Sequence, residues 1–230
     1  MKNYLSKIYI IHYTKLEGRK SHMLSEIDRW SLDRVPVHFE ERHDQELMTQ
    51  FDIYQLINKE KFKENTRRDI KNGEISLCLK YKQILEDISK LADDEYVLVL
   101  EDDVIFKEDP FEYINKIIFE CKTNDVNFDC IFMGEAAMRV GDNKDVFFKK
   151  EHPATNGLCT ILYNVGSAKK LLNNLSMFHI DHALDWHFNR IFEEMKFNVY
   201  WGKAITEHGS VIAVHDESRK GLKSSLRSHY

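Results

Sequence analysis

Three consecutive carboxylates, Glu101-Asp102-Asp103, follow an apolar run from Tyr96 to Leu100. Such a run is typical of a strand buried on both faces of a sheet, and ligands of open α/β sheets bind beyond the carboxyl ends of the strands. Because like charges repel and carboxylates are costly where water is excluded, solvent or a cation must compensate them. Glu101 and Asp103 fall on one side of an extended chain. Together they offer Mg²⁺ or Mn²⁺ the oxygen ligands that hard cations prefer, beside substrate phosphates. A solvated acidic turn is the alternative.

A second pair of carboxylates, Asp181 and Asp185, lies four residues apart in a predicted helix over 180–195, and therefore on one face of it. Helical periodicity places Asp181 inside the apolar stripe of that helix and Asp185 at its edge. A carboxylate directed at apolar neighbours needs a partner or a chemical role, such as that of a general base. Asp181 is equally compatible with a helix cap, and the pattern alone leaves both open. We interpret His182 and His187 as structural.

One arginine is a candidate for contacts with a nucleotide. Arg19 lies beside Lys15 and Lys20, shortly after the first predicted strand. The alternative is that these residues form the solvated start of a helix.

The elements that must position these residues alternate along the chain. Apolar runs predict strands at 7–12, 37–40, 96–101, 130–133, 160–163 and 198–201. Helical patterns cover 19–30, 45–57, 73–91, 110–120, 166–175 and 180–195. The polar segments 58–72 and 139–150 are interpreted as loops. Alternating strands and helices predict an α/β fold with a mostly parallel central sheet flanked by helices. No segment has the character of a linker, so we expect a single domain over 1–230.

Composition narrows the class of protein. The 230 residues are 43% hydrophobic and 31% charged, which is typical of a globular chain. A formal net charge of -5 argues against a nucleic-acid partner. No apolar run approaches the roughly 20 residues that span a bilayer, so no transmembrane segment is expected. The N-terminus is interpreted as a strand rather than a signal peptide. Four scattered cysteines, mostly in apolar runs, indicate buried reduced thiols and hence a cytoplasmic location.

Six blocks of the sequence, in order from about 7 to 181, resemble glycosyltransferase family 25, the lipooligosaccharide and procollagen galactosyltransferases. IYIIHYTKLEGRKSHM is similar to the opening strand of that family and its Asn-Leu…Asp-Arg…Met segment, and GEISLCLKYKQIL to its Gly-Glu-(Ile)-x-Cys-x-x-Ser-His block. VLVLEDDVIF resembles the metal-binding strand end, and FDCIFMG the Asp-x-Ile-x-x-Gly pattern. GLCTILYNVGSAKKLL is similar to the Tyr-x-x-(Ser)-x-x-Gly-Ala-x-x-Leu-Leu block, and the aspartate of FHID to that of Pro-Val-Asp. No block is specific alone, but the ordered set is.

The sequence departs from the family pattern at several positions. His12-Tyr13 replaces Asn-Leu, and Gly18 replaces the aspartate before the arginine. Lys80-Tyr81 replaces Ser-His, and Asn164 stands where serine is usual. Loss of that histidine implies either a different acceptor or loss of activity.

The resemblance implies a GT-A type nucleotide-sugar-binding fold and inverting transfer of glucose or galactose from a UDP-sugar. The acceptor would be a hydroxyl on a lipopolysaccharide-type glycan or on protein hydroxylysine. The expected cofactor is Mn²⁺ or Mg²⁺, which would stabilise the charge that develops on the UDP leaving group. Asp103 would hold the ion with Glu101, the latter directly or through water and ribose, and Asp102 would hold the loop. His208 matches the C-terminal histidine with which many GT-A enzymes complete the metal site. It also has the context of an ordinary loop residue.

The same resemblance favours Asp181 as the general base, with Asp185 as the second candidate. Two alternatives to a transferase remain. One is a nucleotide-sugar-binding protein without turnover, which Lys80-Tyr81 supports. The other is a metal-dependent phosphohydrolase, which ranks lower because no second acidic cluster follows a strand. The basic tail, about 208–230, is expected to be mobile and either folds over bound UDP-sugar or only solubilises the chain.

Overall fold

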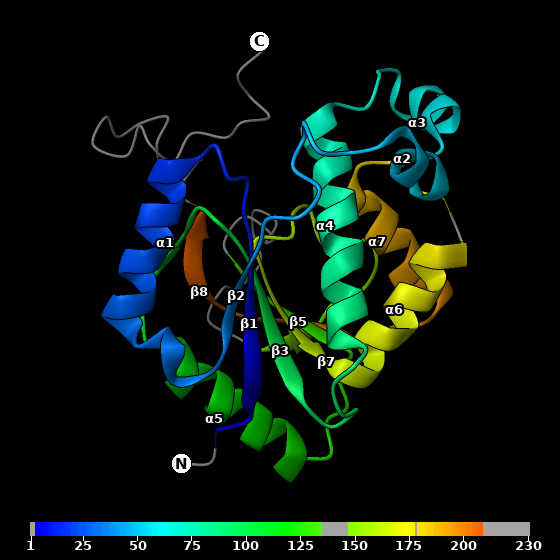
Figure 1. Cartoon of the computed structure of the whole chain (residues 1–230). Coiled ribbons are helices and arrows are strands. Elements are labelled where there is room, and N and C mark those ends of the chain that lie inside the picture. Colours follow the sequence, from blue (N-terminus) through cyan, green and yellow to red (C-terminus); the bar gives the residue numbers. More distant parts are fainter. Residues whose placement is uncertain (1–2, 135–146, 178, 209–230) are drawn as a thin grey trace.

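The computed structural model describes residues 3–134, 147–177 and 179–208, and these form one sheet with helices on both faces (Figure 1). The strands of the described residues are β1 (Leu5–Ile11), β2 (Val37–Glu40), β3 (Tyr96–Glu101), β4 (Val104–Phe106), β5 (Cys130–Gly134), β6 (Phe148–Lys149), β7 (Thr160–Asn164) and β8 (Val199–His208). Their order is β2-β1-β3-β7-β5-β8-β4, and β6 pairs with β8. Strands β1, β2, β3, β5 and β8 run in one direction, and β7, β4 and β6 run in the other. The predicted α/β fold is confirmed, with a mixed sheet in which one direction predominates.

The helices of the described residues divide between the two faces of the sheet. They are α1 (Glu17–Trp30), the short 3₁₀ helix η1 (Leu32–Arg34), α2 (Gln50–Leu56), α3 (Lys59–Thr66), α4 (Asn72–Ile88), α5 (Pro110–Thr123), α6 (Val165–Met177) and α7 (Leu184–Glu194). One apolar cluster packs α2, α4, α6 and α7 against the sheet, and a second packs α1 and α5 against its other face. Figure 1 shows α1 and α4 on opposite sides of β1 and β3. Two separate cores therefore hold one sheet between them.

Strand β3 shows why its sequence is continuously apolar. Val97 and Val99 belong to the cluster with α4 and α7, whereas Leu98 and Leu100 belong to the cluster with α1 and α5. All four side chains are fully buried. A strand covered on both faces requires apolar residues at odd and even positions alike.

The predicted elements differ from the structure in several places, including a short strand, β6, in the predicted loop 139–150. The segment 58–72, predicted as a loop, contains helix α3, which buries only Phe62 and so shows no apolar stripe. Strand β4 follows directly after the carboxylates and is too short for a periodic signal. Helix α7 begins at Leu184 rather than at 180, because Ile180 pairs with Ile57 in a short β-bridge.

The strand order places the acidic triplet at a point where ligands bind in open α/β sheets. The chain passes from β1 to β2 on one side of β1 and then returns to place β3 on its other side. At such a reversal, the carboxyl ends of the central strands leave a crevice between their connections. Ile11 lies opposite Glu101 in the parallel pairing of β1 with β3. The residues that follow these two strands are therefore neighbours.

Several expectations about the whole chain meet the structure here. All four cysteines are buried and none is in a disulfide, as predicted. In the described residues, no helix is long and apolar enough to cross a membrane. The tail beyond His208, with the hypothesis of a lid, lies outside the described residues.

The contact between β5 and the segment before β7 generates a prediction about packing. A Cβ atom on Gly134 would lie 2.1 Å from the Cys159 sulfur. We expect Gly134→Ala to lower the free energy of unfolding by about 1–3 kcal/mol, the usual cost of overpacking a core, as measured by urea denaturation. Adding Cys159→Ala should recover part of the loss, so the double variant should be less destabilised than the sum of the single changes. Gly166→Ala is the control, since its nearest contact would be 3.2 Å. Equal stability of Gly134→Ala and the unchanged protein would refute the predicted clash.

Candidate functional site

The carboxylates after β3 are compensated by an arginine of the chain itself. Beyond Glu101 the chain turns before β4, and both Asp102 and Asp103 face helix α1. The Arg19 guanidinium lies 2.5 Å from Asp102 through Nη1 and 3.2 Å from Asp103 through Nη2. His12, directly after β1, lies 2.8 Å from the other oxygen of Asp102 through Nδ1. All four side chains are buried. Asp102 and Asp103 therefore do not form a solvated acidic turn.

This arrangement sets the ionisation of its members. Burial alone would raise the pKa of Asp102, but the hydrogen bond with His12 and the charge of Arg19 hold it below the ordinary value. Burial opposes the charge on Arg19, yet Asp102 and Asp103 raise the pKa of the guanidinium. Burial of a guanidinium or a carboxylate costs desolvation free energy. The attraction between the two groups offsets that cost only while both are present. The Arg19 cluster, defined as Arg19, His12, Asp102 and Asp103, thus joins β1, α1 and the end of β3.

Glu101 and Asp103 do not share a side, in contrast to the expectation from an extended chain. Glu101 is the last residue of β3 and continues the alternation of Val97 and Val99, toward α4 and α7. Asp103 lies in the turn, is 1% exposed and faces Arg19. The expectation assumed a straight strand, whereas the chain turns after Glu101.

Asp185 lies on α7, and the Glu101 charge reaches it. It is half-buried, and its Oδ1 accepts a hydrogen bond of 2.9 Å from the Trp186 backbone N–H. Burial raises the pKa of Asp185, and the negative charges of Glu101 and Glu74 raise it further against that hydrogen bond. The negative charges of one carboxylate on β3 and one on α4 therefore act on Asp185. A carboxyl group with a raised pKa is a better proton acceptor at neutral pH than an ordinary aspartate.

Asp181 has the opposite environment. It precedes α7, is 2% exposed, and lies 3.0 Å from Arg190, 2.9 Å from His182 and 3.5 Å from Lys61. Burial would raise the pKa of Asp181, but His182 and Arg190 outweigh it and hold the pKa far below the ordinary value. The reading of Asp181 as a cap is wrong, because the residue at the N-cap position of α7 is Ala183. Asp181 is instead the anion of an ion-pair cluster, which leaves it a weak proton acceptor.

The buried histidine of this cluster is neutral. His187 is fully buried, with Nδ1 3.5 Å from Asp181. Burial and the neighbouring Arg190 charge lower the pKa of His187 to about 4, although the negative charge of Asp181 raises it. Both histidines that we interpreted as structural therefore contact Asp181.

Lys80, where the family pattern has serine, is a buried structural cation. Its Nζ lies 2.5 Å from Asp44 and donates to the backbone oxygens of His12 at 2.6 Å and Glu40 at 3.3 Å. Asp44 in turn accepts a 3.1 Å hydrogen bond from the Thr14 backbone. Tyr81 is fully buried and donates to the Leu158 oxygen at 2.9 Å. Lys80 thus holds the segments that follow β1 and β2, whereas Tyr81 holds the segment that precedes β7.

The remaining candidate, His208, is brought near the acidic turn by strand pairing. Its backbone lies opposite Val104 in the antiparallel ladder of β8 and β4. Its side chain lies outside the described residues. Strand β8 extends much further than the predicted 198–201, and this extension is what returns the chain to the turn.

The described residues contain one group of three or more potential metal ligands, and it lies elsewhere. His38, Glu40 and Asp87 come together at β2 and α4. Arg42 contacts both carboxylates of that group, at 2.7 Å from Asp87, and so compensates them.

The sequence showed His12 and Lys80 only as departures from the family pattern, and their contacts with Asp102 and Asp44 were not foreseen. The signal for His12 was its position directly after a strand parallel to β3, which only becomes informative once the two strands are known to be neighbours. Lys80 carried no signal of its own, because a lysine in a helical pattern is normally solvated.

Comparison with known proteins gives weak similarities. No protein-family model and no curated protein matches the chain. Among solved structures, it is similar to a glycosyltransferase involved in the glycosylation of the major capsid of PBCV-1, at 12% identity and a TM-score of 0.46, over 94% of this chain and 98% of that chain. It is also similar to A197 from STIV, at 11% identity and 0.42, over 87% and 82%. Mouse xyloside xylosyltransferase 1 in its apo form follows at 12% and 0.38, over 85% and 83%. Similarities of this size carry no functional argument.

The Asp181 cluster generates a prediction about stability. Asp181→Asn should lower the free energy of unfolding by about 1–3 kcal/mol, because the buried carboxylate that accepts from Arg190 and contacts His182 becomes a neutral amide. The folded-state pKa of Asp181 is below its unfolded value, so its contribution is complete above about pH 4 and is lost as the pH falls further. The difference between the variant and the unchanged protein should therefore be largest at neutral pH. Urea denaturation at several pH values measures it.

Asp185→Asn is the matched control for this measurement. Because folding raises the pKa of Asp185, its charge opposes folding, and its removal should not destabilise the protein at neutral pH. Unchanged stability of Asp181→Asn would show that the ion-pair cluster contributes nothing to the fold.

Proposed function

We propose that this chain is a glycosyltransferase of the GT-A type, which transfers glucose or galactose from a UDP-sugar to a hydroxyl of a glycan or protein. The observation that carries the proposal is the meeting of β1 and β3 at the reversal in strand order. There Arg19 holds Asp102 and Asp103, and the charge of Glu101 acts on Asp185 of α7. The ordered resemblance of six sequence blocks to glycosyltransferase family 25 supports it independently.

The donor half of the site comprises the ends of β1 and β3. Nucleotides bind beyond the carboxyl ends of strands at such a reversal. Lys80 and Asp44 fix the backbone after β1 and β2, and Arg19 fixes the turn after β3. A site held this way needs little reorganisation when a ligand binds, so less binding energy is lost in ordering it. In this proposal Arg19 and Asp102 shape the nucleotide site.

A divalent ion remains part of the proposal, with a changed assignment of its ligands. A UDP diphosphate is anionic, and at this edge it approaches carboxylates, so an ion between them fits the charges present. Glu101 would hold that ion with His208, since Asp103 is buried against Arg19. When bound, Mn²⁺ or Mg²⁺ supplies positive charge to the departing diphosphate.

Asp185 is the residue we assign as general base, in place of Asp181. Inverting transfer requires a carboxylate that takes the proton of the acceptor hydroxyl as its oxygen attacks the anomeric carbon. The bond from that carbon to the UDP oxygen breaks as the new glycosidic bond forms, and UDP leaves with the electron pair. The raised pKa of Asp185 suits it for this proton, whereas the cations around Asp181 oppose protonation of that residue. Buried free thiols are consistent with the proposed cytoplasmic location.

The proposed base can be tested by kinetics. Asp185→Asn should reduce kcat by about 10²-fold or more, the usual contribution of a general base, with little change in the donor KM. The acidic limb of the pH profile of kcat/KM should lie above the ordinary aspartate range and should be absent in the variant. Initial rates of UDP release from UDP-glucose and UDP-galactose, with acceptor present, measure both.

Asp181→Asn is the kinetic control, and it should retain kcat once corrected for the folded fraction. The reverse result, an inactive Asp181→Asn beside an active Asp185→Asn, would return the base to Asp181. UDP-sugar binding without any UDP release would instead favour the binding protein without turnover.

The proposed metal site can be tested without turnover. Isothermal titration of UDP with and without Mn²⁺ should show that the ion increases affinity, and Glu101→Gln should remove that increase while the protein stays folded. Asp94→Asn, an exposed carboxylate near the other end of β3, is the control. Asp103→Asn should mainly loosen Arg19 and lower the melting temperature. A UDP affinity independent of Mn²⁺ in the unchanged protein would exclude the metal from the proposal.

A further inference from the structure

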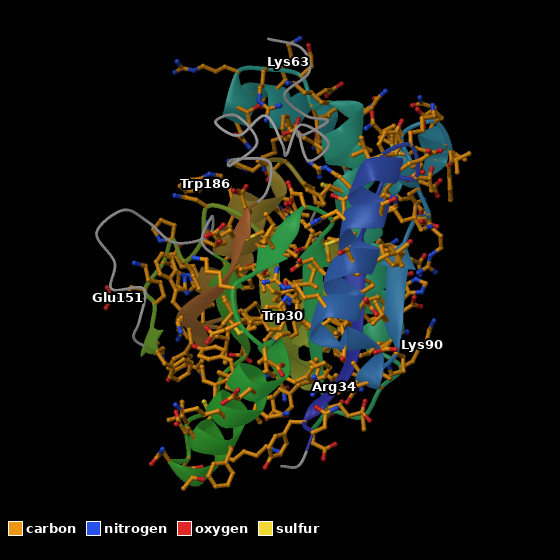
Figure 2. All side chains as sticks on the ribbon, turned by 90° about the vertical axis from the view of Figure 1, so that its left-hand side faces the viewer. Trp30, Arg34, Lys63, Lys90, Glu151 and Trp186 are labelled. Carbon is orange, nitrogen blue, oxygen red and sulfur yellow. The ribbon has the colours of Figure 1, made fainter. Side chains whose placement is uncertain are left out.

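A cavity of about 310 Å³ lies against one face of α7, apart from the Arg19 cluster. Its wall includes Trp186, Arg190 and Glu193 from that helix, His182 just before it, and His152 from the segment that follows β6. Small-molecule sites typically occupy about 300–1,000 Å³, so this cavity has the size of a site for a small ligand. Figure 2 shows Trp186 and Glu151, the neighbour of His152, on one side of the molecule and Lys90 on the other.

Trp186 is the unusual member of this wall. Its side chain is 48% exposed, whereas Trp201, in the core nearby, is fully buried. An indole leaves a large apolar face in water when nothing covers it, and such rings are enriched where ligands and partners bind. A flat apolar surface beside charged and polar groups is therefore the feature that a ligand must match.

The polar part of the wall is fixed before any ligand binds. Arg190 Nη1 lies 3.0 and 3.1 Å from the two Asp181 oxygens, which orients its half-exposed guanidinium. Asn189 accepts from the backbone N–H groups of Ala154 and Thr155 and donates to the Thr155 oxygen, at 2.7, 3.0 and 2.7 Å. These bonds hold the segment after His152 against α7. A wall that does not reorganise loses little binding free energy on ordering.

The chemistry of the wall matches a neutral sugar ring. A pyranose presents C–H groups on one face, which pack on an indole, and hydroxyl groups at its edge, which exchange hydrogen bonds with guanidinium, imidazole and carboxylate groups. The charge of Arg190 is already matched by Asp181, and Glu193 adds a negative charge. An anionic ligand would therefore gain little electrostatic binding free energy in this cavity.

The position of the cavity connects it with the proposed base. Trp186 directly follows Asp185 on α7, and successive residues of a helix are about 100° apart around its axis. The cavity face thus adjoins the face that carries Asp185. We propose that this cavity is an acceptor subsite, in which a neutral glycoside stacks on Trp186 and is held by Arg190 and Glu193. The assignment of the bound sugar as the acceptor rests on the proposed transferase function. The binding of a sugar rests on the cavity alone.

Saturation-transfer NMR without UDP-sugar or metal tests the bound sugar. The probes are methyl β-glucopyranoside, methyl β-galactopyranoside and lactose, with glucuronic acid as the anionic comparison. We expect at least one neutral probe to bind, with saturation strongest on the protons of one ring face. Trp186→Ala should weaken that binding about tenfold or more, the scale of a buried aromatic contact, and Trp186→Phe should keep most of it. Tyr54→Ala removes another exposed aromatic ring, 84% exposed and outside the cavity, and should change nothing.

Three outcomes would overturn the inference. They are no neutral probe bound by the unchanged protein, equal binding by folded Trp186→Ala, or tighter binding of glucuronic acid than of the neutral sugars. Circular dichroism and melting temperature verify that each variant is folded.

The acceptor role has a separate readout. With UDP-sugar and a glycoside that serves as acceptor, Trp186→Ala should raise the acceptor KM while the rate of donor hydrolysis in the absence of acceptor stays unchanged. Absence of any UDP release would contradict the proposed transferase yet leave the binding result standing. Normal transfer with an unchanged acceptor KM in Trp186→Ala would contradict the subsite alone.

Discussion

Arg19 brings one guanidinium to two buried carboxylates, and the geometry of the site follows from that pairing. Removal of one partner of such a buried pair typically costs about 3–5 kcal/mol, a large part of the roughly 5–15 kcal/mol that stabilises a domain. The pair therefore fixes the turn after β3 against α1, with His12 linking it to β1. Asp102 and Asp103 are held by Arg19 in this way, and Glu101, the last residue of β3, acts through its charge on Asp185 of α7.

The second constraint is the unequal environment of two aspartates four residues apart. Asp181 is surrounded by Arg190, His182 and Lys61, whereas burial and the negative charges of Glu101 and Glu74 raise the pKa of Asp185. Opposite neighbours move the two pKa values in opposite directions. In enzymes, pairs of titratable groups whose pKa values are moved apart in this way mark the acid and base roles. Here the same separation divides a structural anion from a candidate base.

The structure gives a physical reason for two departures from the family pattern, Lys80 and Tyr81. Lys80 replaces a polar residue with a fully buried ion pair to Asp44, and Tyr81 replaces histidine with a core side chain. Lys80 stabilises the donor half of the proposed site, and Tyr81 holds the segment before β7. The acceptor half depends on α7, which carries Asp185 and Trp186 on adjoining faces and whose Asn189 holds the opposite wall of the cavity. The departures from the family pattern implied either a different acceptor or loss of activity. A rigid donor half and a sugar-sized cavity beside the proposed base favour the different acceptor.

The sequence by itself determined the α/β class, the burial of β3 on both faces and the position of the acidic triplet at a strand end, because each depends on local periodicity. It did not reveal helix α3, whose single buried Phe62 leaves no pattern. It also placed Asp103 on one side with Glu101, and it did not show that the environments of Asp181 and Asp185 move their pKa values in opposite directions. Those properties depend on residues distant in the chain: Arg19 lies 83 positions from Asp102, and Glu101 reaches Asp185 from another element. Only the tertiary structure decides which charges meet, and the meeting of charges sets burial, pKa and role.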